Sequence, residues 1–170
     1  MNLHPAFVHL PIGLLTLYVL FEVVPFGRWY PRAAWEDIKF FLVAVGGLGL
    51  LAALATGQLA ESSTMARAAR NVLRLHKNFA GLSTAIFGIL AAAYLIRWIF
   101  EKHADLLGPF AADFSFVRDA ANVVLKRRIA VPMALAGFIA LSITGALGGI
   151  IVYGQNVDFM TKFVYSLFFH

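Results

Sequence analysis

Three histidines stand where apolar stretches of this chain begin. His4-Pro5-Ala6-Phe7-Val8-His9 opens the first stretch, and His76 opens another one. Ionisable side chains at the mouth of a hydrophobic span are rare and commonly functional. Imidazole is a strong ligand for haem iron and other transition metals. The chain has five histidines and no cysteine, so histidine is its only strong soft-metal ligand, and thiolate sites and disulfides are excluded.

The composition indicates an all-α membrane protein with a single integral domain over residues 1–170. Of the 170 residues 61% are hydrophobic and only 14% are charged, and the mean hydropathy is +0.78. A soluble domain of this length cannot bury so much apolar surface, so the lipid bilayer must act as its solvent. The net charge of +5 suits anionic headgroups. No motif typical of nucleic-acid binding accompanies it.

Four apolar stretches are long enough to cross about 30 Å of hydrocarbon, which takes about 20 helical residues. The pattern predicts a four-transmembrane-helix bundle with two interfacial amphipathic segments. Glycines in the second span allow a neighbouring helix or a flat cofactor to come close to its backbone. The expected spans are about 5–24, 38–59, 72–100 and 129–153, and the interfacial segments are about 110–126 and 158–170.

The distribution of lysine and arginine predicts the orientation, because cytoplasmic loops carry the excess of positive charge. With four spans, both termini and the second connection lie on one side, which holds five basic residues. The other side holds nine, namely Arg28, Arg32, Lys39, Arg97, Lys102, Arg118, Lys126, Arg127 and Arg128. We therefore expect a multi-pass protein of the bacterial inner (cytoplasmic) membrane with both termini facing outward.

The same topology brings the three histidines to the outward face. One helical turn deeper, His9 is followed by Gly13 and His76 by Ala80, and these small side chains leave room for a porphyrin edge. Helical bundles hold haem b between imidazoles from two facing helices. The sequence predicts that His9 and His76 bind a haem iron. His4 is the alternative ligand, although on an ideal helix it points about 140° away from His9.

Other interpretations stay open. The histidines could be interfacial residues that cap helices or contact headgroups. Zinc or copper fits less well than haem, since no carboxylate adjoins the histidines to complete a compact site. Arg70 and Arg74 lie on one helix face, where they could neutralise haem propionates or meet lipid phosphates.

Two motifs resemble a prokaryotic membrane family catalogued as a domain of unknown function. The first is His4 to Gly13, of the form HPxxVHxPIG, and the second is Gly148 to Val157, of the form GGxxVYxxxV. The resemblance extends over most of the chain and implies a four-span bundle. Relatives of this kind occur joined to c-type cytochrome or Rieske modules, which implies work near electron-transfer chains.

The favoured function is a haem b-binding electron-transfer component rather than a stand-alone enzyme. It would pass electrons between a quinol in the bilayer and an outward-facing cytochrome or other redox partner, as a subunit of a larger membrane complex. The alternative is a cofactor-free accessory subunit of such a complex. A transporter is the weakest of the three, because no charged residue lies at mid-depth in the predicted spans.

Overall fold

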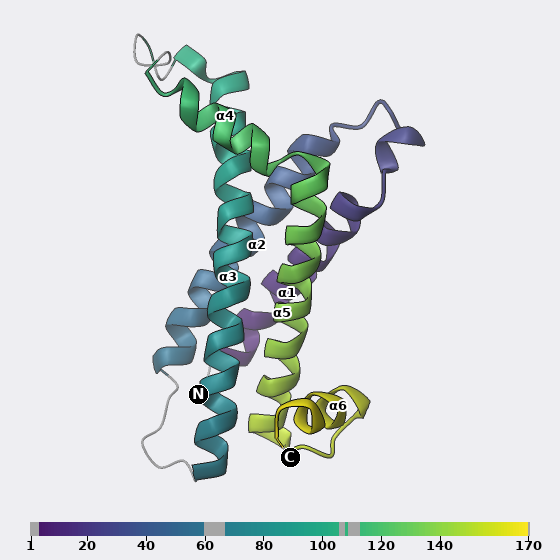
Figure 1. Ribbon diagram of the computed structural model, residues 1–170, viewed down its shortest axis with the longest axis vertical. Helices are drawn as coiled ribbons and strands as arrows, with labels where there is room; N and C mark the ends of the chain where they lie inside the picture. Colours follow the sequence, from purple (N-terminus) through teal and green to yellow (C-terminus); the bar gives the residue numbers. More distant parts are fainter. Residues whose placement is uncertain (1–3, 60–66, 106–107, 109–112, 170) are drawn as a thin grey trace.

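A computed structural model describes residues 4–59, 67–105, 108 and 113–169 of the chain. Four long helices form an elongated bundle, and two short helices lie at its opposite ends (Figure 1). The described residues contain no strand. The predicted all-α fold class is therefore confirmed.

The first half of the chain is a helical hairpin. Helix α1 (His4–Val23) leads through a short 3-10 helix, η1 (Phe26–Arg28), into α2 (Trp35–Leu59). Pro25 lies two residues beyond the end of α1 and cannot continue a helix, because it lacks a backbone N–H. Glu36 and Asp37 in the first turn of α2 interact favourably with the positive end of its dipole.

The second half forms the other side of the bundle. Helix α3 (Arg67–Lys102) runs its full length, α4 (Ser115–Val124) crosses one end, and α5 (Arg127–Tyr153) returns to the other end. Helix α6 (Phe159–Phe168) then lies beside the end of α5. Its first turn is closed by a capping box, in which Asp158 accepts a hydrogen bond from the backbone N–H of Thr161 at 2.9 Å.

The expected spans coincide with the four long helices. The third helix extends beyond the predicted 72–100 at both ends, because its polar terminal turns can remain helical outside an apolar layer. Of the predicted interfacial segments, 110–126 contains α4, with residues 110–112 outside the described part. The segment 158–170 contains α6, and residue 170 is likewise outside the described part.

Two buried clusters form the core. The larger one joins α1, α2, α3 and α5 around Leu15, Tyr18, Val43 and Phe87. The smaller one, with Leu147 at its centre, has described members from α3, α5 and α6 only. The first hairpin and the second half of the chain therefore share a core along only part of the bundle.

Glycine allows the close approach of α1 and α2. A Cβ added at Gly46 would lie 2.7 Å from side-chain carbons of Leu15, and one at Gly49 would lie 2.9 Å from Pro11. Real Cβ contacts are not this short, so a larger residue at either position would force the neighbouring side chain or helix to shift. The predicted role of these glycines in close packing is confirmed for the α1–α2 pair.

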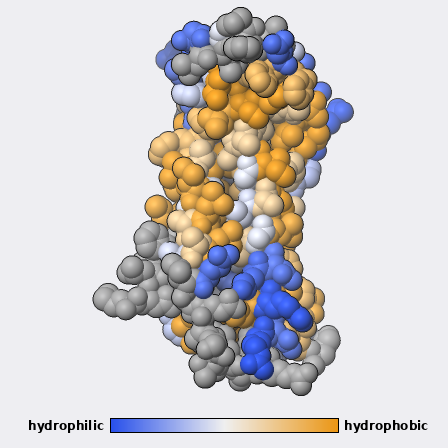
Figure 2. Space-filling view, turned by 90° about the vertical axis from the view of Figure 1, so that its left-hand side faces the viewer, coloured by the Kyte–Doolittle hydropathy of each residue, from blue (hydrophilic) through white to orange (hydrophobic). Residues whose placement is uncertain are grey.

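The surface agrees with a membrane environment. Helices α2, α3 and α5 are long and apolar enough to cross a bilayer, and the apolar part of α1, Val8–Val23, is shorter. On the face in Figure 2, hydrophobic side chains cover most of the middle, and hydrophilic ones gather near the two ends.

Candidate functional site

The charged side chains and the histidines among the described residues lie near the two ends of the bundle. We call the end where α1 and α3 finish and α2 and α5 begin the charged end. We call the opposite end, where His9 and His76 lie and α5 finishes, the histidine end. The charged end is uppermost in Figure 1 and the histidine end is lowest.

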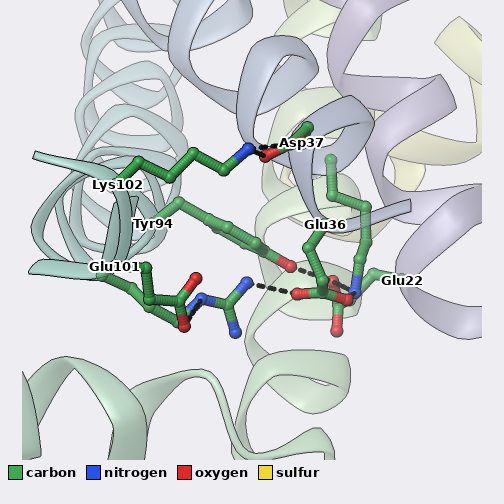
Figure 3. A network of polar contacts seen from close by, with 8 residues as sticks. Glu22, Glu36, Asp37, Tyr94, Glu101 and Lys102 are labelled. Carbon is green, nitrogen blue, oxygen red and sulfur yellow. Dashed lines mark hydrogen bonds and ion pairs between the residues drawn. The ribbon is translucent and has the colours of Figure 1, made fainter. Parts of the chain in front are cut away.

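At the charged end a glutamate is buried inside the bundle. Glu22, in the last turn of α1, is only 4% exposed. Its Oε2 accepts a hydrogen bond from the Tyr94 hydroxyl of α3 at 2.9 Å and lies 3.4 Å from Lys39 Nζ of α2. Figure 3 shows Glu22, Glu36 and Tyr94 meeting where the three helices come together. A charge in such a place is costly unless it is paired and hydrogen-bonded, and here it is both.

The ion pairs continue outward from Glu22 with alternating sign. Lys39 Nζ lies 2.5 Å from Glu36 Oε1, and Arg97 bonds the other oxygen of Glu36. Arg97 Nε is also 3.9 Å from Glu101. A separate, more exposed pair joins Lys102 to Asp37 at 2.6 Å (Figure 3). These contacts tie the start of α2 to the end of α3.

Tyr94 lies at the centre of this network. The Arg97 guanidinium carbon is 5.0 Å from the centre of the Tyr94 ring, and Lys39 Nζ is 5.8 Å from it. Both distances allow cation–π attraction. Deeper in the bundle, the Tyr18 and Tyr94 rings form a T-shaped pair at a centroid distance of 6.1 Å. The buried Tyr18 hydroxyl has no hydrogen-bond partner among the described residues.

A pocket of about 530 Å³ opens beside Glu22. It is lined by the end of α1, by η1, by the first turns of α2 and by Arg127 of α5. The Arg127 guanidinium donates to the backbone oxygens of Glu22 at 3.2 Å and Val23 at 2.7 Å. Arg127 therefore caps the C-terminal carbonyls of α1 and ties that helix to α5.

At the histidine end, His76 is half-buried and contacts α5. Its Nδ1 lies 2.9 Å from the backbone oxygen of Thr144. A Cβ added at Gly148 would lie 3.4 Å from Cε1 of the same ring. Because a carbonyl oxygen only accepts hydrogen bonds, this contact requires the proton on Nδ1. In the neutral form of such a ring, the lone pair is on Nε2.

The other predicted haem-site residues lie on α1 and α3. His9 is exposed on α1, and a Cβ at Gly13 would meet nothing within 4 Å. Ala80 is half-buried on α3, and Arg70 and Arg74 are exposed on that helix. His4 is the first residue of α1, and its side chain lies outside the described part of the structure. The described residues contain no group of three or more metal-ligating side chains.

The structure thus brings His76 of α3 together with Thr144 and Gly148 of α5. His9 lies on α1, which contributes no described member to the smaller core cluster.

Sequence reasoning missed the Glu22 network. The available signal was one acidic residue inside the apolar run Leu-Tyr-Val-Leu-Phe-Glu-Val-Val, with Lys39 and Arg97 at the same end of neighbouring helices.

Comparison with known proteins supports the membrane assignment. Residues 1–160 match the model of a family described as a predicted membrane protein (DUF2231). No curated protein and no solved structure gives a significant match. The family match covers all four long helices and reaches into α6. The chain therefore belongs to the DUF2231 family of predicted membrane proteins.

Proposed function

We propose that this protein binds haem b at its histidine end and transfers electrons within the membrane. His76 and His9 would hold the iron through their imidazoles, and His4 is the alternative to His9. The observation that carries the proposal is the contact between His76 Nδ1 and the Thr144 oxygen at 2.9 Å.

This contact is the kind of support that a metal-binding histidine needs. Ligating imidazoles commonly donate their other N–H to a backbone carbonyl, which fixes the ring orientation and raises the basicity of the ligating nitrogen. The Thr144 oxygen has that role here, and Nε2 is the ligating atom. Gly148 supports the proposal because it places no side chain against the ring.

The packing at this end also favours a cofactor. The smaller core cluster draws its described members from α3, α5 and α6. A porphyrin between α1 and α3 would add apolar surface beside this cluster. Exposed Arg70 and Arg74 on α3 then bind the haem propionates, since guanidinium groups pair well with carboxylates. When bound, haem supplies the one-electron chemistry, and the protein tunes its potential through ligands and burial.

The absorption spectrum of the detergent-purified protein tests this proposal. We expect a Soret band in the oxidised protein and sharp α and β bands after dithionite reduction, as six-coordinate haem b gives. A flat visible spectrum in folded protein, with no haem released by acid–acetone, contradicts the proposal.

A cofactor-free accessory subunit is the second candidate. The larger core cluster and the ion pairs of the charged end join all four long helices through side chains alone. On this alternative, a double His9→Ala/His76→Ala variant assembles and functions like the parent protein.

The proposed membrane arrangement has four spans in the bacterial inner membrane, with the charged end cytoplasmic. Helices α4 and α6 lie at the two interfaces, since both expose large apolar side chains, among them Phe116 at 69% and Phe159 at 82%. The excess of lysine and arginine at the charged end supports this orientation.

The absence of cysteine allows a direct test of the orientation. We expect Asn156→Cys, in the exposed connection between α5 and α6, to react with a membrane-impermeant maleimide in intact spheroplasts. Ala33→Cys, in the exposed α1–α2 connection, should react only after lysis. The reverse pattern would place the charged end outside.

A further inference from the structure

The pocket at the charged end has the features of a site for a small lipid-soluble molecule. Its volume of about 530 Å³ lies within the range of about 300–1,000 Å³ that is usual for ligand pockets. It adjoins the α1–α2 connection, where Trp29 and Tyr30 are 64% and 63% exposed. Such aromatic side chains mark the boundary between hydrocarbon and water, so a molecule dissolved in the bilayer can reach the pocket.

Aromatic rings form one part of the pocket wall. Phe21, Phe26 and Trp35 all line it. Phe26 and Trp35 are stacked at a centroid distance of 5.5 Å, and Phe21 packs edge-on against Trp35 at 5.4 Å. Trp35 is also held by a hydrogen bond from Nε1 to the Tyr30 oxygen at 2.8 Å. A flat ring fits such a surface by stacking or edge contact.

The pocket offers both a hydrogen-bond acceptor and donors. Glu22 lines it, and a carboxylate that already contacts Tyr94 and Lys39 still has acceptor capacity for a ligand hydroxyl. Arg28 and Arg127 line the same pocket. An arginine has five N–H donors, and the two contacts of Arg127 with α1 carbonyls leave others for a ligand oxygen.

We propose that this pocket binds the head group of a quinone or quinol. The ring lies against the aromatic wall, one oxygen is hydrogen-bonded to Glu22, and another oxygen is bonded to an arginine. This chemistry favours a flat, lipid-soluble ring with polar oxygens over a plain hydrocarbon. A hydrocarbon has no group that could donate a hydrogen bond to the buried carboxylate.

The proposed quinone site is separate from the haem proposal. Tyr94, which contacts Glu22, and His76 are 18 residues apart on α3, about 27 Å at a rise of 1.5 Å per residue. The proposal concerns binding at the charged end, and it holds whether or not the histidine end carries iron.

Quenching of Trp35 fluorescence by decylubiquinone tests the proposal in the full-length protein. A Trp29→Phe/Trp98→Phe background leaves Trp35, in the pocket wall, as the single tryptophan. We expect saturable quenching at micromolar quinone. Glu22→Gln should weaken binding by about tenfold, as expected for the loss of a hydrogen bond to a charged group. Glu101→Gln changes an exposed acid of the same network outside the pocket and should leave binding unchanged.

A second variant keeps the test valid should Glu22→Gln fold poorly. Ala34→Phe adds bulk to an exposed residue that lines the pocket without changing the ion pairs, and it should also abolish saturable quenching. Linear quenching that is equal in all variants indicates partition of quinone into micelles and overturns the proposal. A co-purified phospholipid that quinone does not displace assigns the pocket to a lipid headgroup and also overturns it.

Discussion

We expect Lys39→Ala to lower the free energy of unfolding by about 3–5 kcal/mol, the usual cost of removing one partner from a buried ion pair. Lys39 lies 3.4 Å from Glu22, and the two side chains are 13% and 4% exposed. The substitution leaves the Glu22 carboxylate inside the bundle with the Tyr94 hydroxyl and no cation beside its Oε2. Far-ultraviolet circular dichroism during titration of SDS into dodecyl maltoside micelles measures the change.

Two control variants separate the cost of leaving a buried charge unpaired from the cost of losing an ordinary side-chain contact. Lys102→Ala removes an ion pair in which both side chains are about half exposed, 46% and 47%, and should cost no more than about 1 kcal/mol. The double variant Glu22→Gln/Lys39→Met removes both charges and should recover most of the lost stability. If Lys39→Ala and Lys102→Ala lowered the free energy of unfolding equally, Glu22 would be hydrated well enough to need no neighbouring cation.

The second large effect concerns His76. On the haem proposal, His76→Ala removes an axial ligand. The affinity for haem should then fall by more than roughly 10- to 100-fold, which is the usual loss of metal affinity when a residue that only hydrogen-bonds a ligand is removed. The Soret absorbance per protein in the purified variant measures this loss. Gly148→Leu, which places a side chain against the His76 ring, should lower occupancy as well.

His103→Ala is the matched control, because His103 packs on Trp98 at a centroid distance of 4.3 Å, at the charged end. This variant should keep its haem. Comparison of His9→Ala with His4→Ala then identifies the second ligand, since loss of the low-spin α and β bands in one of them marks the missing imidazole. An unchanged spectrum in His76→Ala would exclude His76 as a ligand.

The two ends of the bundle differ in how they are held together. At the charged end, Glu22, Lys39 and Arg97 connect three helices through ion pairs and hydrogen bonds. At the histidine end, the described core joins only α3, α5 and α6. The charged end is therefore held by polar contacts between helices, whereas the described core of the histidine end is apolar packing of α3, α5 and α6.

The sequence alone determined the class of the fold and the positions of the long helices. This was possible because the signals are local. A backbone inside a bilayer must satisfy its own hydrogen bonds, so an apolar stretch of sufficient length has to be helical. Helix ends are also local, as at Pro25 after α1 and at Asp158 and Thr161, which cap α6. The membrane family was also recognisable from the sequence, and the match of residues 1–160 to its model confirms it.

Only the tertiary structure decided which side chains meet. Glu22 and Tyr94 are 72 residues apart, and His76 and Thr144 are 68 residues apart. Their contacts depend on how each helix is rotated about its axis. Where a helix is apolar on nearly all sides, as α1 is, periodicity carries little information on that rotation. Close packing, such as that of Leu15 against Gly46, fixes the rotation of α1 about its axis. This rotation places Glu22 inside the bundle and His9 on its surface.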